Sequence, residues 1–223
     1  MNSKLSHLLK VTTPSLTGRV RGGSVLLLFS LLLLFSCSEN EEYDPYSDWE
    51  ARNTTWFYQV ADTARTAINA ARAQYGDSWE EHCEWRMYKS LRKSPSYQSG
   101  LTVDSICVHI IQKGAGTKTP LYSDVVRVVY RGWLIPAIDA YGNTFEKVFD
   151  QTFYGTFDEE TAAYTENNVS AFTEGFGTAL QYMTEGDEWI VCIPSELFYG
   201  NETVGTVPAY SAARFRILMR KIY

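Results

Sequence analysis

Apolar residues in the first third of the chain recur with a helical period. From Asp48 to Gln74 the sequence is rich in alanine and long side chains, and apolar residues follow one another at helical steps at Trp49, Trp56, Val60, Ala64, Ala67 and Ala71. This spacing puts them on one side of a helix, and Tyr75-Gly76 is a typical helix end. We therefore predict an amphipathic helix over residues 48–74 whose apolar stripe packs against the rest of the protein.

From Leu101 onward the apolar residues follow the shorter period of β-strands. The segments are SICVHIIQKG, SDVVRVVYRGWLI, DEWIVCIPSELF and AARFRILMRKI, and a further strand is possible in the ambiguous region near Trp85 to Leu91. Between them, TEGFGTALQYM from Thr173 to Met183 predicts one short helix. Several antiparallel strands around one helix predict an α+β domain.

The N-terminus has the pattern of a secretion signal. Four basic residues precede an apolar run from Val25 to Phe35, which ends at Ser36-Cys37. The run has about 11 residues, whereas a membrane-spanning helix needs ~20. The letters LFSC, Leu34 to Cys37, resemble a bacterial lipobox, which implies lipidation of Cys37 and location in the cell envelope. The alternative is a buried cysteine at the end of an apolar run.

The segment that follows the apolar run is strongly acidic. Six acids and no base lie between Glu39 and Glu50, which is typical of a solvated tether. Acids directly after a lipidated cysteine also resemble a surface-export signal of some lipoproteins, and a plain spacer is the alternative. Removal of residues 1–36, with four bases and no acid, takes the formal net charge from -6 to -10. Nucleic-acid binding is not expected, because it needs a basic face.

Four parts follow from these patterns: a lipoprotein signal peptide (1–36), an acidic tether (37–47), a helical N-terminal arm (48–95) and the α+β domain (96–223). Outside the signal, Cys83, Cys107 and Cys192 have no zinc-site spacing. One disulfide among them is possible in an oxidising envelope, and its pairing stays open. With three histidines in the whole chain, neither a histidine-based metal site nor a catalytic triad is expected.

Five sequence blocks, in order, resemble the FK506-binding-protein (FKBP) family of peptidyl-prolyl cis-trans isomerases. They are VRVVYRGWL (126–134), VFDQT (148–152), GFGTALQYMTEG (175–186), IPSELFYG (193–200) and VPAYSAARF (207–215). The resemblance covers about residues 101–223. It implies an antiparallel, strongly curved sheet wrapped around the short helix, and proline-containing polypeptides as substrates.

The reaction of that family requires no bond breaking. Rotation about an X-Pro bond meets a barrier of ~18–20 kcal/mol that comes from amide resonance. A dry aromatic pocket and a few donors placed for the twisted amide would lower it. The resemblance therefore implies no metal, no cofactor and no covalent nucleophile.

The resemblance also assigns site residues. As catalytic residues it implies Asp150, Tyr130 and Tyr199; as substrate-binding residues it implies Phe149, Phe172, Thr173, Phe176, Val207 and Phe215. Tyr199 would donate its hydroxyl, and Thr173 its backbone N–H, to a substrate carbonyl. Asp150 would lie beside Tyr130 and point into the apolar pocket, as a fixed dipole rather than a proton donor.

Other interpretations of the same residues remain open. Taken singly, the phenylalanines would be core residues and Asp150 a turn acid. Asn167 stands where the family has a pocket phenylalanine, and Phe198 where it has alanine, so a catalytically weak or inactive peptide-binding or chaperone module is the alternative function. A homodimer through the N-terminal arm is a further possibility.

Overall fold

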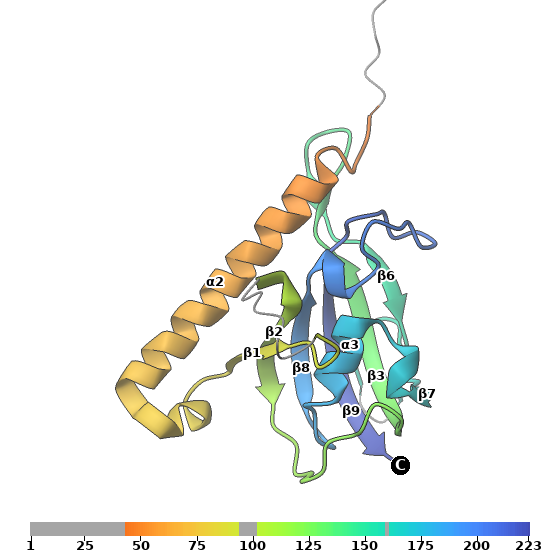
Figure 1. Ribbon diagram of the computed structural model, residues 1–223. Helices are drawn as coiled ribbons and strands as arrows, with labels where there is room; N and C mark the ends of the chain where they lie inside the picture. The colour runs from red at the N-terminus through yellow and green to blue at the C-terminus, as the bar shows by residue number, and fades with distance from the viewer. Residues whose placement is uncertain (1–42, 94–101, 159–160) are drawn as a thin grey trace, which may run out of the picture. The chain divides into compact units, whose positions relative to one another are not determined.

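Antiparallel strands and one short helix form the C-terminal part of the protein, as the hydropathy pattern predicts (Figure 1). The computed structural model describes residues 43–93, 102–158 and 161–223. The predicted signal peptide, Cys37 and most of the tether lie outside these residues. In chain order the elements are α2 (Trp49–Tyr75), η1 (Gly76–Glu81), β1 (Trp85–Lys89), η2 (Thr102–Asp104), β2 (Ser105–Gln112), β3 (Val125–Leu134), β4 (Ala137–Ile138), β5 (Thr144–Phe145), β6 (Val148–Gln151), β7 (Thr165–Asn168), η3 (Val169–Ala171), α3 (Glu174–Leu180), β8 (Glu188–Ile193), η4 (Ser195–Leu197) and β9 (Ala213–Ile222).

The main sheet is antiparallel and has the strand order β1-β2-β8-β9-β3-β6. Strand β3 is long enough to hold two short partners on its outer side. Its first half pairs with β7, from Val125 opposite Asn168 to Val128 opposite Thr165, and its second half pairs with β6. The α+β fold class is thus confirmed.

Alternating side chains divide the sheet into two covered faces. On β2, Ile106 and Val108 contact the main core around α3, whereas Cys107 between them contacts the cluster beneath α2. The same alternation separates Val191 from Cys192 on β8. Successive residues of a strand point to opposite faces, so α2 and α3 lie on opposite sides of the sheet. Both faces of β2 and β8 are therefore apolar.

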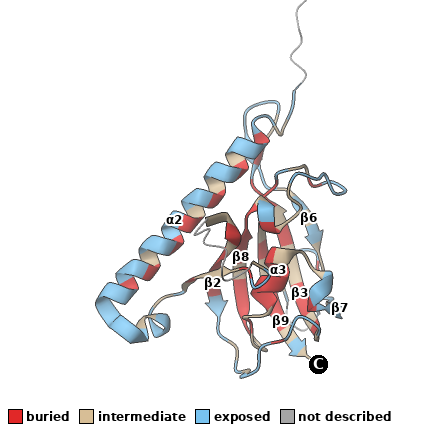
Figure 2. Cartoon of the chain, in the orientation of Figure 1, coloured by how far each residue is buried: buried red, intermediate tan, exposed pale blue. Residues whose placement is uncertain are grey.

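Helix α2 is the predicted amphipathic helix. It ends at Gly76, whose φ of 56° and N–H bond to the Arg72 carbonyl form a glycine C-cap. Its buried residues are Trp49, Asn53, Phe57, Ala61, Ala64, Ile68 and Ala71, on the side that faces the strands (Figure 2). The buried side of α2 differs from the predicted stripe. Trp56, Val60 and Ala67 are only partly buried, whereas Asn53, a polar residue, is buried.

The first turns of α2 are tied to the loop that precedes β9. The Trp49 indole N–H donates to Ser211 Oγ at 2.8 Å, and the Asn53 side-chain oxygen accepts the Ala212 N–H at 2.8 Å. Trp49 also packs with Leu134 and Val207. The helical arm is thus part of the same folded body as the sheet. No helix among the described residues is long and apolar enough to span a membrane.

Candidate active site

A cavity of about 430 Å³ lies between α3 and the strands β3, β6 and β7. Its lining residues are Tyr130, Phe149, Asp150, Thr165, Asn167, Ala171, Phe172, Thr173, Phe176, Phe198, Tyr199 and Phe215. Eight of the nine residues that the sequence proposes for the site therefore meet in one place. The ninth, Val207, lies outside the lining and packs with Trp49 in a cluster that includes the partly buried Phe198 and Tyr199.

Aromatic rings form the walls and floor of the cavity. Phe176, on α3, is buried and meets Phe215 edge-on, with centroids 4.9 Å apart and planes at 89°. Tyr130 also meets Phe176 edge-on at 5.4 Å, and Phe172 stacks on it at 4.7 Å. Edge-to-face and offset rings hold one another in fixed orientations. The cavity thus presents an apolar surface of closely packed aromatic rings.

Gly132 on β3 makes room for two of these rings. A Cβ atom at this position would lie 2.5 Å from Phe215 Cε1 and 2.8 Å from Phe149 Cζ. Such distances are far inside van der Waals contact. The glycine two residues after Tyr130 is therefore required by the packing of the aromatic wall.

Tyr130 and Asp150 form the polar corner of the cavity. They lie on neighbouring strands, where Asp150 is opposite Gly132, and the Tyr130 hydroxyl donates to Asp150 Oδ2 at 2.7 Å. Burial and the adjacent Asp150 carboxylate raise the pKa of Tyr130 well above its ordinary value, although a hydrogen bond with Thr165 opposes this. Asp150 itself is solvent-exposed at the edge of the cavity. It is therefore a hydrogen-bonded fixture at the mouth and not a desolvated acid.

Two donors near the rim have no protein acceptor. Among the described residues, the Tyr199 hydroxyl and the Thr173 backbone N–H make no hydrogen bond. Burial raises the pKa of Tyr199, so its hydroxyl stays protonated at neutral pH. Thr173 is the N-cap residue of α3, and its free N–H adds to the positive end of that helix. Both groups can donate to a carbonyl bound in the cavity.

Four lining residues lie outside the set proposed from the sequence. Asn167 and Phe198 are positions where the sequence departs from the FKBP pattern, and both contribute to the lining. Phe198 packs on Tyr199 at 4.1 Å and on Phe149 at 5.5 Å, which narrows that side of the cavity. Nothing in the sequence alone marks Thr165 or Ala171 as a site residue. Thr165 can be placed in the site only once β7 is known, because it lies two residues before Asn167 on that strand.

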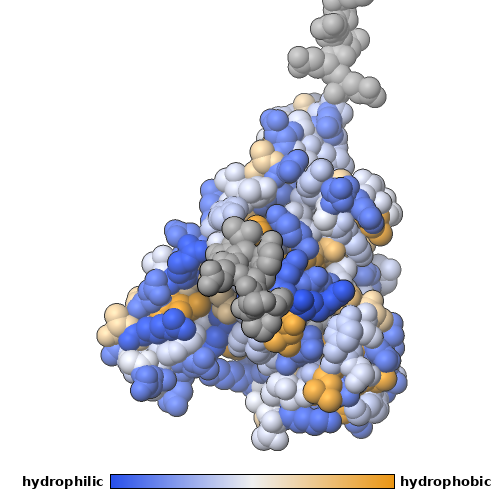
Figure 3. Space-filling view, in the orientation of Figure 1, coloured by the Kyte–Doolittle hydropathy of each residue, from blue (hydrophilic) through white to orange (hydrophobic). Residues whose placement is uncertain are grey.

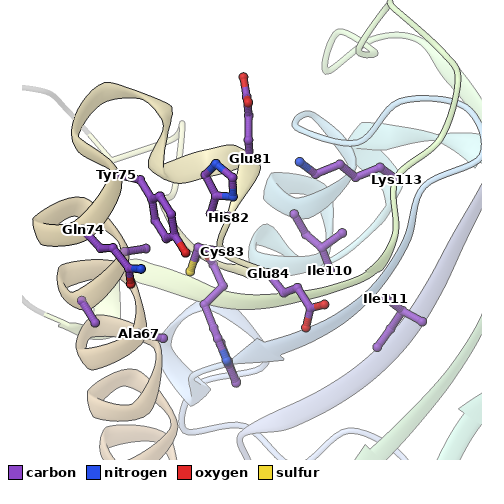
Figure 4. Close-up of a pocket in the computed structure, with 13 residues that line it drawn as sticks. Ala67, Gln74, Tyr75, Glu81, His82, Cys83, Glu84, Ile110, Ile111 and Lys113 are labelled. Atoms are coloured by element: carbon purple, nitrogen blue, oxygen red, sulfur yellow. Dashed lines mark hydrogen bonds between the residues drawn. The ribbon is translucent and has the colours of Figure 1, made fainter.

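A second cavity, of about 690 Å³, lies away from the aromatic site, between the end of α2 and strand β2 (Figure 4). Tyr75, His82 and Cys83 lie on one side of it, and Ile110 and Lys113 on the other. In the part of the chain that the structure describes, no three histidine, cysteine or acidic side chains gather as a metal site. The face drawn in Figure 3 is mostly hydrophilic, with small separate apolar patches. The aromatic cavity remains the candidate active site.

Comparison with known proteins shows which family the C-terminal domain is similar to. Residues 116–220 match the family model of FKBP-type peptidyl-prolyl cis-trans isomerases. The C-terminal part of the chain is therefore similar to the FKBP-type family. The matched residues include every residue that lines the cavity.

Two similar proteins come from bacteria. The outer membrane protein MIP of Legionella longbeachae is 36% identical over 96 residues, which are 43% of this chain and 34% of that protein. This chain thus matches about a third of the length of its relative. A solved peptidyl-prolyl cis-trans isomerase from Pseudomonas syringae pv. tomato is 20% identical with a TM-score of 0.43, over 74% of this chain and 94% of that chain.

Proposed function

We propose that this protein catalyses cis-trans isomerisation of X-Pro bonds in polypeptides. The observation that carries the proposal is the aromatic cavity of about 430 Å³ with two unpaired donors, the Tyr199 hydroxyl and the Thr173 N–H, at its rim. The proline ring would lie on Phe176, between Tyr130 and Phe215. The Tyr199 hydroxyl and the Thr173 N–H would donate hydrogen bonds to the carbonyl oxygens that flank the twisted bond.

The physical basis is preferential binding of the twisted amide. In water the planar amide is stabilised by resonance and by solvent hydrogen bonds to its carbonyl oxygen. Transfer of the planar amide to an apolar cavity removes part of that solvation. A hydrogen-bond donor in a fixed position then favours the twisted amide only if it binds the twisted amide better than the planar one. Since no covalent bond breaks, the side chains need only bind, orient and exclude water.

An isomerisation assay with a proline-containing peptide tests the proposal. The full-length mature chain is expected to accelerate the cis-to-trans rate, and Tyr199→Phe and Asp150→Ala are expected to lower it. Tyr141→Phe is the matched control, because Tyr141 is 91% exposed and is not one of the residues that line the cavity. A wild-type rate equal to the uncatalysed rate would exclude catalysis and leave a peptide-binding module.

We further propose that the protein is held in the cell envelope by a lipid on Cys37, and that its clients are exported polypeptides. The support is the basic and apolar N-terminal pattern followed by LFSC, together with a relative that is named an outer membrane protein. Metabolic labelling with a radioactive fatty acid tests the anchor: Cys37→Ala should abolish the label and release the protein from membranes. Protease treatment of intact cells distinguishes a periplasmic from a surface position.

Dimerisation through the N-terminal arm is a separate proposal with a specific constraint. The apolar stripe of α2 already packs on Cys107, Cys192 and the strands around them. A dimer through α2 would therefore use its exposed polar face. Sedimentation of the mature chain tests this; the monomer mass at high protein concentration would exclude it.

A further inference from the structure

The chain that carries Tyr199 continues into a loop, residues 200–212, which leads to strand β9. Gly200 follows Tyr199 directly. Its N–H donates to the Ser195 carbonyl at 2.8 Å, and its carbonyl accepts the Tyr210 N–H at 2.7 Å. The second of these bonds closes the loop at its base. The peptide that follows Tyr199 is thus joined to the far end of the loop, at Tyr210.

Tyr210 has a backbone conformation that tyrosine does not favour. Its φ is 59°, in the left-handed region, and among the described residues Asp48 is the only other non-glycine residue with a positive φ. Asparagine and glycine tolerate this region better than tyrosine does. Such a conformation persists only where the surrounding structure holds it. The side chain of Tyr210 is not part of the cavity lining, so its role is not contact with a ligand there.

The two residues that follow Tyr210 are held by the first turn of α2. The Trp49 indole N–H donates to Ser211 Oγ at 2.8 Å, and the Asn53 side-chain oxygen accepts the Ala212 N–H at 2.8 Å. All four of these residues are buried. Because a buried polar group that loses its partner is costly, these bonds resist any rotation of the chain directly after Tyr210.

A second link joins the loop to residues that precede α2. Lys147 Nζ donates to the Thr206 carbonyl at 3.0 Å and to the Tyr46 hydroxyl at 2.8 Å. The Tyr46 ring meets the Trp49 ring edge-on, with centroids 4.9 Å apart. Val207, next to Thr206 in the chain, belongs to the same buried cluster as Trp49. The start of the helical arm therefore holds the loop at its middle as well as at its end.

We propose that Trp49 is a positioning residue for Tyr199. The first turn of α2 holds Tyr210 in its left-handed conformation, and Tyr210 in turn fixes the peptide next to Tyr199. The inference rests on the proposed isomerase function, in which the Tyr199 hydroxyl donates to a substrate carbonyl. A donor stabilises a twisted amide only when it is placed correctly. The helical arm then supports the reaction, although none of its described residues lines the cavity.

Trp49→Phe tests the proposal, because it removes the indole N–H and keeps an aromatic ring in the cluster. With a proline-containing peptide the variant should lower kcat about fivefold and change KM less than about twofold, since a misplaced donor weakens binding of the twisted amide. In the Tyr199→Phe background the same substitution should have almost no further effect on kcat, because the hydroxyl that it positions is already absent.

A second substitution should restore the rate. Trp49→Phe combined with Tyr210→Asn should recover most of the lost kcat, because asparagine adopts the left-handed conformation with less support from α2. A role of Trp49 in packing alone would give no such recovery. A kcat unchanged by Trp49→Phe, a fall that persists in the Tyr199→Phe background, or no recovery with Tyr210→Asn would overturn the proposal.

Trp56→Phe is the matched control. Trp56 lies further along the same helix and is partly buried against the same cluster, and it makes no hydrogen bond within the described part of the chain. Its replacement should leave kcat at the wild-type value. Urea unfolding of both variants shows whether each is folded under the conditions of the assay.

Hydrogen exchange separates this proposal from the isomerase proposal. If the wild-type chain did not accelerate isomerisation, the isomerase function would fail, and exchange of the Tyr210 amide would still show whether Trp49 holds the loop. This amide should exchange about tenfold faster in Trp49→Phe than in wild type or Trp56→Phe, because local opening at the base of the loop becomes easier. Equal exchange rates in the three proteins would overturn the role of Trp49.

Discussion

The Tyr130 hydroxyl donates to Asp150 Oδ2 at 2.7 Å, across neighbouring strands β3 and β6. This bond occupies the tyrosine proton and fixes the carboxylate at the edge of the cavity. The tyrosine proton is then directed at the carboxylate and away from the cavity. The pair is suited to orient dipoles around a twisted amide, in keeping with the proposed isomerisation, which moves no proton.

A double-mutant cycle tests whether Tyr130 and Asp150 act as one unit. Tyr130→Phe and Asp150→Ala should each lower kcat/KM about tenfold, or ~1.4 kcal/mol in the barrier. Because each removal disables the same pair, the double variant should lose little more than either single variant. Isomerisation kinetics of the four proteins give the coupling energy. Independent roles would instead produce a loss of about a hundredfold.

The pH profile should be flat near neutrality. Burial and the Asp150 carboxylate raise the pKa of Tyr130, and burial raises that of Tyr199. Both hydroxyls therefore remain protonated from about pH 6 to pH 9, below even the ordinary tyrosine value of ~10. We expect kcat/KM to change less than about twofold over this range, measured in buffers of constant ionic strength. A bell-shaped profile would show that a titrating group takes part in the rate-limiting step.

The raised pKa values of the two tyrosines also determine whether the free energy of unfolding rises or falls at alkaline pH. A tyrosine whose pKa is higher in the folded than in the unfolded state contributes its full stabilisation below pH ~10. The contribution is lost as the pH rises above that value, because the unfolded chain releases its protons first. Urea unfolding of wild type and Tyr130→Phe should therefore show a smaller alkaline loss in the variant. An identical loss in both proteins would contradict the assignment to Tyr130.

Gly132→Ala should damage the aromatic wall. The new methyl group would meet Phe215 at 2.5 Å and Phe149 at 2.8 Å, so the rings must move. Overpacking of this kind costs ~1–3 kcal/mol in the free energy of unfolding, and a displaced wall should weaken peptide binding. Urea denaturation and calorimetry measure the two effects. Adding Phe215→Leu should restore part of the stability but not the binding; unchanged stability in Gly132→Ala would contradict the packing argument.

Much of the fold follows from local pattern. The α2 helix, the strands β2, β3, β8 and β9 and the helix α3 each have a clear apolar period. Strands β4, β5 and β7 were not predicted, because two of them have two residues each and β7, with the sequence TENN, has no apolar residue. Pairing with β3 makes β7 a strand. A single sequence does not contain that long-range information.

The site is predictable to the extent that its residues fall in recognisable blocks. Tyr130, Asp150, Phe176 and Tyr199 do so, and all four line the cavity. Thr165 and Asn167 reach it through the pairing of β7, which local pattern misses. Asn53 was also missed, since a polar residue on the buried side of a helix is unexpected until its partner, the Ala212 N–H, is known. Long-range hydrogen bonds account for these omissions.

Asn53→Leu should destabilise the protein by removing the link between α2 and the loop before β9. Asn53 is 2% exposed; its amide donates to the Trp49 carbonyl at 2.7 Å, and its oxygen accepts the Ala212 N–H at 2.8 Å. The substitution leaves the Ala212 N–H buried and unpaired, which costs ~1–3 kcal/mol in the free energy of unfolding. Urea denaturation measures it against Asn69→Leu, an exposed position of the same helix where we expect almost no loss. Equal effects at the two positions would contradict this role of Asn53.

The three cysteines of the described residues are free thiols in different environments. Cys107 and Cys192 face one another on β2 and β8, beneath α2, and both are buried. Burial raises the pKa of each to about 12, and for Cys192 the neighbouring Cys107 adds to the rise. Cys83 is only partly buried, next to the second cavity. Since the thiolate is the reactive form, the three positions should differ strongly toward alkylating reagents.

Iodoacetamide at about pH 8 should therefore label Cys83 alone in the native protein. Cys107 and Cys192, with a pKa of about 12, are almost entirely protonated at that pH and lie under α2, so they should react only after unfolding in urea. Mass spectrometry of peptides labelled before and after denaturation measures the three rates. Cys83→Ser should abolish native labelling altogether, which separates slow reaction at Cys83 from reaction at the buried pair. Rapid native labelling of Cys107 or Cys192 would show that α2 leaves the sheet in the folded state.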